Sequence, residues 1–352
     1  MMINKEEELQ RITALKTIMM FLVVFYHVLL ALQRNGYGKG ENSSYTLFQG
    51  LPYIVMWLNS FHIQTFTFAS GYLFYMIRYE KKGYREISKD IVKRWMRLMF
   101  PFYAVSLLWA IPTEVFERGF SWSLIIKNFL LAISPAQLWF LPMLFWIYLV
   151  FYLFSDVIEK IPVSVILGLY AIVYLGKIFL NRYIPMNILQ ISVSIEYLLY
   201  YYLGFLFRKS KIKKYNRVKD FTMLLSAVVL EIIYLWLWIQ VKNRTLIDVI
   251  QPVVCGFQVI AVVTLGRLFK VERLSGFQIY QKISKNSMGI YLFHQQILYL
   301  TRSFFENFPP VLFVLLNFIV VFFISYGITT GLRKIKIGQL VIGEYSERIR
   351  EE

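Results

Sequence analysis

The first apolar stretch of the chain, LKTIMMFLVVFYHVLLAL, runs from Leu15 to Leu32 and carries two ionisable residues, Lys16 and His27. A stretch of this length is enough for an α-helix to cross a bilayer. At 100° per residue, Lys16 and His27 lie within about 20° of one helix face and roughly 16 Å apart along the axis. An ionisable residue inside a membrane is costly, so each is a candidate functional residue. One face of this helix is therefore expected to carry a cation near its start and an imidazole deeper in the membrane.

Similar apolar runs recur along all 352 residues. Apolar residues make up 58% of the chain and charged residues 17%, whereas a soluble domain carries about 25% charged residues. The runs are too long for the short alternating strands of a membrane β-barrel. They predict an all-α polytopic membrane protein with both termini on the same side, and a single integral-membrane domain over residues 1–352. We expect ten spans, near residues 12–33, 51–78, 98–116, 137–157, 161–181, 188–207, 219–241, 247–268, 284–302 and 309–331.

The basic residues between these spans sort to one side of the membrane. Of the 38 lysines and arginines, 28 fall in segments on one side and 9 on the other, while Lys16 lies inside the first span. By the positive-inside rule both termini are cytoplasmic, including the tail 332–352. The net charge of +17 therefore reflects the basic residues that orient the protein in the membrane, and we expect no nucleic-acid partner. The apolar segment 120–134 is short, and we expect it to lie at the membrane interface.

Two histidines lie in the first two predicted spans. His27 is expected in the outer half of the bilayer, where an imidazole is suited to act as a general base near neutral pH. A core imidazole hydrogen-bonded to a neighbouring helix fits the sequence equally well. Lys16 taken alone is typical of a cation that snorkels to the interface. His62 is expected in the middle of the second span, and the small pair Ser70–Gly71 after it predicts a close helix approach or a local break.

A basic cluster precedes the third span in IVKRWMRLMFPFY, residues 91–103. Arg94 and Arg97 are three positions apart, so they lie on neighbouring parts of one helix face. Two guanidinium groups placed in this way can bind a phosphate through paired hydrogen bonds. Anchoring of basic residues at the cytoplasmic surface is the alternative. Pro101 is expected to kink or begin a helix.

The remaining candidates lie in later spans. SMGIYLFH, residues 287–294, holds Tyr291 and His294, and we expect His294 to have a packing or hydrogen-bonding role. Glu196 and Glu231 are carboxylates within spans, and each is expected either to handle protons or to pair with a buried cation. The single cysteine, Cys255, excludes an internal disulfide, and with three histidines in the chain we expect no metal site.

Taken together, five stretches resemble the bacterial membrane acyltransferase-3 family, and they occur in the family's order. Lys16 and His27 match its basic residue and histidine in the first helix, although arginine is commoner than lysine there and the usual preceding acidic residue is absent. The second stretch has Gln64 where proline is common. The other matches are the Arg-x-x-Arg segment before a proline, the Trp-Phe-Leu motif, and the Ser-x-x-x-Tyr-x-x-His segment. In order, the later stretches are FHIQTFTFASGYLF (61–74), KRWMRLMFPFY (93–103), LWFLPMLF (138–145) and SMGIYLFH (287–294).

The resemblance implies transfer of an acyl group, usually acetyl, from cytoplasmic acyl-CoA in a bacterial cell membrane. The implied acceptor is a hydroxyl of a cell-surface or exported glycan or a lipid-linked sugar, and membrane lipids surround the chain. We expect no bound cofactor, with acetyl-CoA as co-substrate. His27 is the implied catalytic residue. The implied donor-binding residues are Lys16, Arg94 and Arg97, and the further candidates are His62, Ser70, Tyr291, His294 and Glu196.

Two alternatives remain at this point. A transporter or exporter of a glycan or small molecule would use His27, Glu196 and Glu231 as a proton path, which fits the intramembrane ionisable residues equally well. Transporters often show two related halves, and no such symmetry is visible in the sequence. The second alternative is a catalytically silent scaffold for a glycan synthase.

Overall fold

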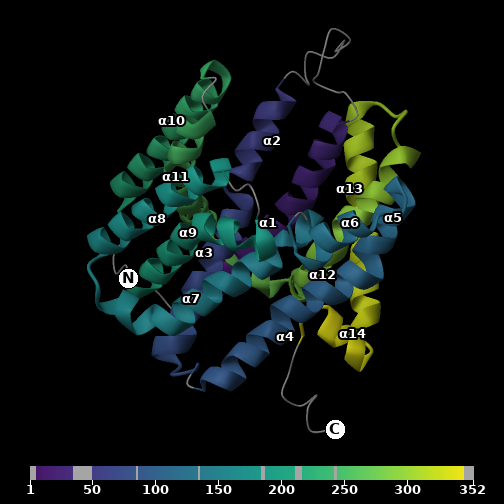
Figure 1. The fold of residues 1–352 in the computed structure, drawn as a ribbon. Coiled ribbons are helices and arrows are strands. Elements are labelled where there is room, and N and C mark those ends of the chain that lie inside the picture. Colours follow the sequence, from purple (N-terminus) through teal and green to yellow (C-terminus); the bar gives the residue numbers. More distant parts are fainter. Residues whose placement is uncertain are drawn as a thin grey trace.

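The computed structural model describes residues 5–34, 50–84, 86–133, 135–183, 187–210, 216–241 and 244–344. This part of the chain is built from helices without strands (Figure 1), which confirms the predicted all-α class. The α-helices are α1 Lys5–Arg34, α2 Leu51–Asn59, α3 His62–Tyr75, α4 Ile87–Val105, α5 Ile111–Arg118, α6 Trp122–Ile125, α7 Phe140–Lys160, α8 Val163–Tyr183, α9 Ile191–Lys209, α10 Arg217–Gln240, α11 Arg244–Leu268, α12 Gln278–Thr301, α13 Pro310–Leu332 and α14 Lys336–Val341.

Among the described residues, seven helical stretches are long and apolar enough to cross a membrane. They are α1, α4 with α5, α7 with its preceding turn, α8, α10, α11 and α13. The other three predicted spans correspond to α2 with α3, to the tyrosine-rich α9 and to α12, which carries many polar residues. The polytopic membrane architecture is therefore confirmed, and the count of ten remains a prediction.

The second predicted span is interrupted. The chain leaves α2 at Asn59 and re-enters a helix at His62, with Phe61 between them in a non-helical conformation (φ −139°, ψ −23°). Ser60 donates to the Trp57 carbonyl oxygen at 2.7 Å, which satisfies one of the free carbonyls at the end of α2. His62 keeps its predicted place in the middle of the span 51–78, but the expected continuous helix is wrong, because His62 is the first residue of α3.

Of the two roles predicted for Pro101, to kink or to begin a helix, the structure excludes the second, because Pro101 lies inside α4. A proline within a helix removes the hydrogen bond to the carbonyl four residues earlier, here that of Arg97. A π-helical segment, Ser106–Ala110, then joins α4 to α5. In the predicted interfacial segment 120–134, α6 and a π-helical segment, Ile126–Leu130, are too short to cross a bilayer.

Glycines bring α3 and α9 into direct backbone contact. A Cβ atom added at Gly71 would collide with the Tyr201 carbonyl oxygen, and one added at Gly204 would collide with that of Phe68. The sequence offered a close approach or a break at Ser70–Gly71, and the structure has the close approach. A larger residue at either glycine would separate the two helices, so these positions fix how α3 and α9 pack.

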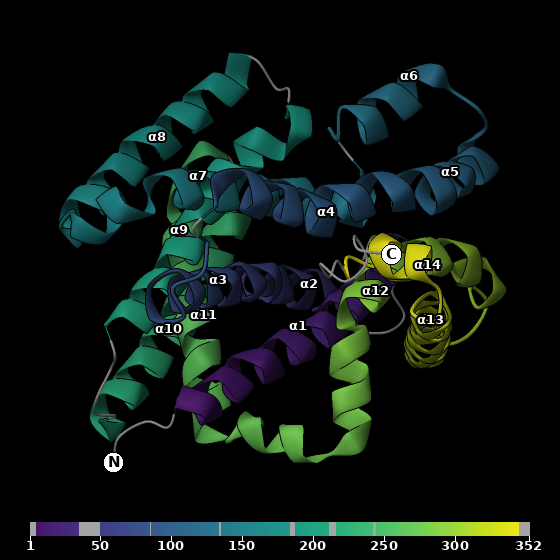
Figure 2. The same cartoon turned by 90° about the horizontal axis from the view of Figure 1, so that it is seen from below.

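Helix α1 lies at the centre of the arrangement, in contact with α3, α12 and α13 (Figure 2). Its Val23, Val24 and Val28 are at most 1% exposed. Helices α8 and α10 lie at the periphery and expose apolar side chains such as Ile172 (70%) and Phe221 (67%). Helices that are apolar around their circumference are typical of membrane spans, so these faces are suited to contact lipid.

Candidate active site

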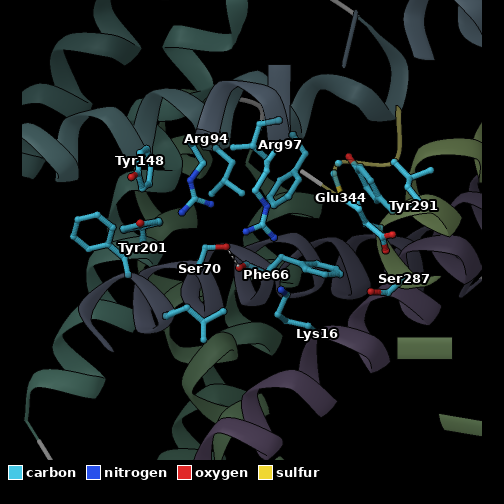
Figure 3. Close-up of a pocket in the computed structure, with 18 of the residues that line it drawn as sticks. Lys16, Phe66, Ser70, Arg94, Arg97, Tyr148, Tyr201, Ser287, Tyr291 and Glu344 are labelled. Carbon is cyan, nitrogen blue, oxygen red and sulfur yellow. Dashed lines mark hydrogen bonds between the residues drawn. The ribbon is translucent and has the colours of Figure 1, made fainter. Parts of the chain in front are cut away.

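A cavity of about 340 Å³ lies between α1, α3, α4, α7, α9 and α12 (Figure 3). Arg94 and Arg97 project into it from α4, and Lys16 projects from α1 on the opposite side. The cavity therefore brings together the three residues that the sequence singled out for donor binding. Its lining also includes Ser70, Ser287, Tyr84, Tyr148, Tyr201, Tyr291, Phe66, Phe140, Lys285 and Glu344.

Arg94 is held in place by aromatic residues. Its Nη2 donates to the Tyr84 hydroxyl at 2.9 Å, and its guanidinium carbon lies 4.0 Å from the centre of the Tyr148 ring. A cation over an aromatic face is attracted by the ring quadrupole, and the contact leaves other N–H groups of the guanidinium free to bind a ligand. Within the described ranges, Arg94, Arg97 and Lys16 make no salt bridge with a carboxylate. Three such cations around one cavity form a site suited to an anion such as phosphate.

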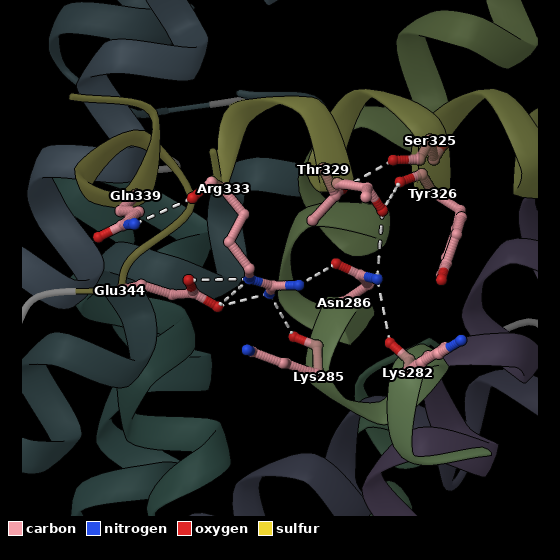
Figure 4. Close-up of polar contacts among 10 residues, drawn as sticks. Lys282, Lys285, Asn286, Ser325, Tyr326, Thr329, Arg333, Gln339 and Glu344 are labelled. Atoms are coloured by element: carbon pink, nitrogen blue, oxygen red, sulfur yellow. Dashed lines mark hydrogen bonds and ion pairs between the residues drawn. The ribbon is translucent and has the colours of Figure 1, made fainter. Parts of the chain in front are cut away.

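One wall of the cavity comes from residues that follow α14, including Gly343 and Glu344. Figure 4 shows the polar contacts that hold Glu344. Nε of Arg333 lies 2.9 Å from both carboxylate oxygens of Glu344, and its Nη2 donates to the Lys285 carbonyl oxygen at 2.7 Å. A further donor bond from Arg333 goes to the Asn286 side chain. We call Arg333, Glu344 and Asn286 the C-terminal clasp. It ties the segment after α14 to the first half of α12.

Gly343 fits this segment against α4. It has φ +76°, and a Cβ atom added there would lie 2.9 Å from the Arg97 carbonyl oxygen. That carbonyl is the one that loses its helical partner to Pro101. The neighbouring Ile342 is 1% exposed, so the segment is packed into the core rather than lying on the surface. In the sequence these residues belong to the predicted cytoplasmic tail 332–352, and no local pattern indicates this role. Residues 345–352 of that tail lie outside the described residues.

All three histidines of the chain gather around the last third of α1. Nε2 of His294 on α12 lies 3.3 Å from Nδ1 of His27 on α1. The ring of His62 on α3 lies 4.7 Å from the ring of Tyr26, centre to centre. His62 and His294 are 1% and 0% exposed, whereas His27 is half-buried. His27 therefore has the most accessible side chain of the three.

Tyr291 links the cavity to the histidines. It lines the cavity, lies one turn before His294 on α12, and donates its hydroxyl hydrogen to the Gln137 carbonyl oxygen. The Gln137 side chain donates to Gln296 at 2.6 Å and to the Leu292 carbonyl oxygen at 2.8 Å. Gln137 is 2% exposed and Gln296 also 2%. Sequence analysis did not single out either glutamine, although a buried amide among apolar residues is itself a signal of a hydrogen-bonded network.

The other candidates take different places. Ser70 lines the cavity, and its hydroxyl donates to the Phe66 carbonyl oxygen of its own helix at 3.0 Å. Glu196 is paired with Lys177 at 2.9 Å, and Glu231 accepts from Gln258 at 3.0 Å. Neither glutamate lines the cavity. Over the described part of the chain, no group of three or more His, Cys, Asp or Glu side chains is arranged to hold a metal ion.

A bundle of apolar helices around an internal cationic cavity defines a polytopic membrane protein with a cavity whose charge suits an anionic ligand. The family model of acyltransferase-3, described as an acyltransferase domain, matches residues 9–330, and the chain belongs to this family. No curated protein and no solved structure matches the chain. The resemblance noted from five short motifs is thus confirmed over nearly the whole chain, and the protein is a membrane acyltransferase in general terms.

Proposed function

We propose that this protein transfers an acyl group, in the first instance acetyl, from acyl-CoA to a hydroxyl of a cell-surface or exported glycan in a bacterial cell membrane. The observation that carries the proposal is the convergence of Lys16, Arg94 and Arg97 on one cavity without a carboxylate partner among the described residues. Coenzyme A carries phosphates, and guanidinium groups bind phosphate through paired, charge-assisted hydrogen bonds. The donor phosphates would occupy the end of the cavity that faces the predicted cytoplasmic side.

His27 supports the transfer step. Eleven residues separate it from Lys16, which corresponds to roughly 16 Å along α1, and the pantetheine arm of a bound donor would cover this distance. The acceptor oxygen attacks the thioester carbon while its proton passes to Nε2 of His27. The carbon–sulfur bond then breaks, and the thiolate takes the proton from His27. The products are the acyl ester and free CoA thiol, so atoms and charges balance.

The transporter alternative draws on Glu196 and Glu231. Glu196 is already paired with Lys177, Glu231 accepts a hydrogen bond from Gln258, and neither faces the cavity. No observation therefore favours a proton path through them over acyl transfer.

The experiment that tests the proposal uses inverted membrane vesicles, which expose the predicted cytoplasmic side to the medium. With radiolabelled acetyl-CoA outside, label should enter the glycan fraction of vesicles from a complemented strain and not that of the deletion strain. Mass spectrometry of the surface glycans should then find the acyl ester in the complemented strain and not in the deletion strain. Equal labelling and identical glycans in the two strains would contradict the proposed function.

A further inference from the structure

The hydrogen bonds around His27 and His294 determine where each ring carries its hydrogen. Nδ1 of His27 lies 2.8 Å from the Val23 carbonyl oxygen, and Nδ1 of His294 lies 2.7 Å from the Tyr291 carbonyl oxygen. A backbone carbonyl only accepts hydrogen bonds. Each neutral ring therefore carries its hydrogen on Nδ1 and has an unprotonated Nε2.

This assignment gives a direction to the contact between the two rings. Nδ1 of His27 and Nε2 of His294 are 3.3 Å apart, and the rings meet edge-on at 64°. His27 is thus the donor, and its Nδ1–H is shared between the Val23 carbonyl and the lone pair of His294. The unprotonated Nε2 of His27 remains available to take a proton. When it does so, the Nδ1–H bonds persist and help to stabilise the imidazolium.

We propose that His294 is a positioning residue for His27: it fixes the orientation of the His27 ring and keeps Nε2 as its basic atom. The proposal rests on the proposed function, in which His27 accepts the proton of the acceptor hydroxyl. His294 touches neither the acyl group nor the acceptor in this scheme. It acts only through His27, as the third member of a catalytic triad acts through its histidine.

The surroundings of His294 are suited to this role because they are rigid. His294 is 0% exposed. The turn that holds it is anchored by Tyr291 to the Gln137 carbonyl and by Gln137 to the Leu292 carbonyl and Gln296. Tyr291 also lines the cationic cavity. The same turn of α12 therefore faces the proposed donor and carries the group that orients the base.

Three variants separate positioning from packing. His294→Leu removes the acceptor, whereas His294→Gln keeps a side-chain oxygen that can accept from Nδ1 of His27. Gln295→Leu is the control, because it removes a neighbouring buried amide whose donor bond goes, among the described residues, to Tyr299 of the same helix. In the vesicle assay with varied radiolabelled acetyl-CoA, His294→Leu should lower kcat by about 10-fold to 100-fold with KM unchanged, since a small misplacement of a reacting group has effects of this size. His294→Gln should recover most of the rate, and Gln295→Leu should behave as wild type.

A wild-type kcat in His294→Leu, or equal losses in the Leu and Gln variants, would overturn the proposal. An unchanged kcat with a raised acetyl-CoA KM would also overturn it and place His294 in donor binding. A wild-type protein without transfer activity would overturn the proposed function instead. The protonated ring nitrogen of His27 can still be determined in that case by nitrogen NMR of purified protein labelled with 15N-histidine. The signals of the three histidines are assigned by single substitutions. His27 should be protonated at Nδ1 only, and a ring protonated at Nε2 would contradict the inference.

Discussion

Arg94 reaches the cavity with its guanidinium already oriented by the Tyr84 hydroxyl and the Tyr148 ring. Little side-chain entropy is then lost when it binds an anion, which is the general advantage of a preorganised site. Arg97 lies one turn further on and is exposed. The side chain of Arg94 is therefore better preorganised for binding than that of Arg97, and we expect Arg94 to contribute more to donor affinity.

Replacing both Arg94 and Arg97 with alanine should weaken acetyl-CoA binding by at least about 10-fold, because a hydrogen bond to a charged group contributes about 1.5–3 kcal/mol. Lysine at both positions should restore only part of the affinity, since it keeps the charge and loses the planar fork. Calorimetry with the purified protein measures both effects. Arg118→Ala is the matched control, because Arg118 ends the same helical stretch and pairs with Glu114 at the surface. Unchanged acetyl-CoA affinity in the double variant would show that Arg94 and Arg97 serve as membrane anchors and do not bind the donor.

His27→Ala should lower the rate of acetyl transfer by about 10²-fold to 10⁴-fold, the usual effect of removing a positioned general base. Acetyl-CoA affinity should stay close to wild type, because His27 does not line the cavity that holds the three cations. The vesicle assay gives the rate, and calorimetry gives the affinity. His62→Ala is the comparison, because it removes an imidazole that packs on Tyr26. If His27→Ala were active and His62→Ala inactive, the general base would be His62 on α3 and not His27.

Local sequence was enough to predict some of these residues and not others. The spacing of Arg94 and Arg97 placed both on one helix face, and both line the cavity. The expected common face of Lys16 and His27 did not put them in the same cavity, because the cavity covers only part of the length of α1. The contact of His27 with His294 joins residues 267 positions apart. It depends on how α1 packs on α12, for which neither helix carries a local signal.

Among the elements, α14 and the turn after it have a larger role than their length suggests. Gly343 is tightly placed beside the backbone of α4, and the C-terminal clasp fixes the residue that follows it. The segment therefore acts as part of the cavity wall. Sequence analysis could not find it, because Arg333 and Glu344 are typical surface residues by composition and their pairing depends on a turn that only the folded chain makes. The break between α2 and α3 was missed for a similar reason, since neither Ser60 nor Phe61 is a strong helix breaker.

Gly343→Ala should destabilise the protein by about 1–2 kcal/mol, because a positive φ is unfavourable for a residue with a Cβ atom. The added methyl group would also press on the Arg97 carbonyl, so acetyl-CoA binding should weaken at the same time. Thermal unfolding in detergent and calorimetry measure the two effects. Gly327→Ala on α13 is the control, because a Cβ atom there meets no neighbouring atom. Wild-type stability and affinity in Gly343→Ala would show that the segment is not part of the cavity wall.

Arg208 links α9 to the segment after α3. Its guanidinium makes two bonds of 2.7 Å to the carboxylate of Glu80. The bond from Arg208 lowers the pKa of Glu80, although burial acts in the opposite direction. A lowered pKa in the folded state means that the ion pair stabilises the protein above the ordinary pKa of a glutamate. This stabilisation is lost as the pH falls through the lowered value.

Glu80→Gln should therefore lower the thermal unfolding midpoint at neutral pH, with a cost of about 1.5–3 kcal/mol for the charged hydrogen bonds. The difference from wild type should shrink as the pH falls below the ordinary glutamate range, and unfolding curves at a series of pH values measure it. Glu86→Gln is the control, because its partner Lys89 is 67% exposed and such pairs contribute little. A difference that stays constant with pH would show that the charge of Glu80 is not what stabilises the fold.

For the molecule as a whole, the salt bridges between different elements follow the predicted membrane topology. Arg11 pairs with Glu272, Arg208 with Glu8, and Arg267 with Asp220. Glu8, Arg11, Arg208 and Glu272 lie in segments predicted to be cytoplasmic, and Asp220 and Arg267 lie within two residues of the cytoplasmic ends of their predicted spans. On the other side, Arg302 pairs with Glu117. Segments on opposite sides of a bilayer cannot make such contacts, so these pairings agree with the predicted sides of the segments, which were assigned without them.

The orientation itself is testable with single cysteines in intact cells. Ser210, at the end of α9, is predicted to face the cytoplasm, and Ser303, between α12 and α13, is predicted to face outward; both are exposed. The native Cys255 is 1% exposed and should give little background. An impermeant thiol reagent should label Ser303→Cys in intact cells and Ser210→Cys only after lysis. The positive-inside rule requires this result, because the segment around Ser210 belongs to the side with 28 of the 38 basic residues.

The same experiment decides from which side the donor enters. Arg97, Lys285 and Glu344 line the cavity. Arg97 and Glu344 lie in segments predicted to be cytoplasmic, and Lys285 lies at the cytoplasmic start of a predicted span, so these residues mark the predicted cytoplasmic end of the cavity. If Ser210→Cys is shielded in intact cells, that end opens to the compartment that contains acyl-CoA. Labelling of Ser210→Cys without lysis would reverse the orientation, place the cationic end outside, and remove cytoplasmic acyl-CoA as the donor. The family assignment would stand in that case, and the proposed direction of transfer would not.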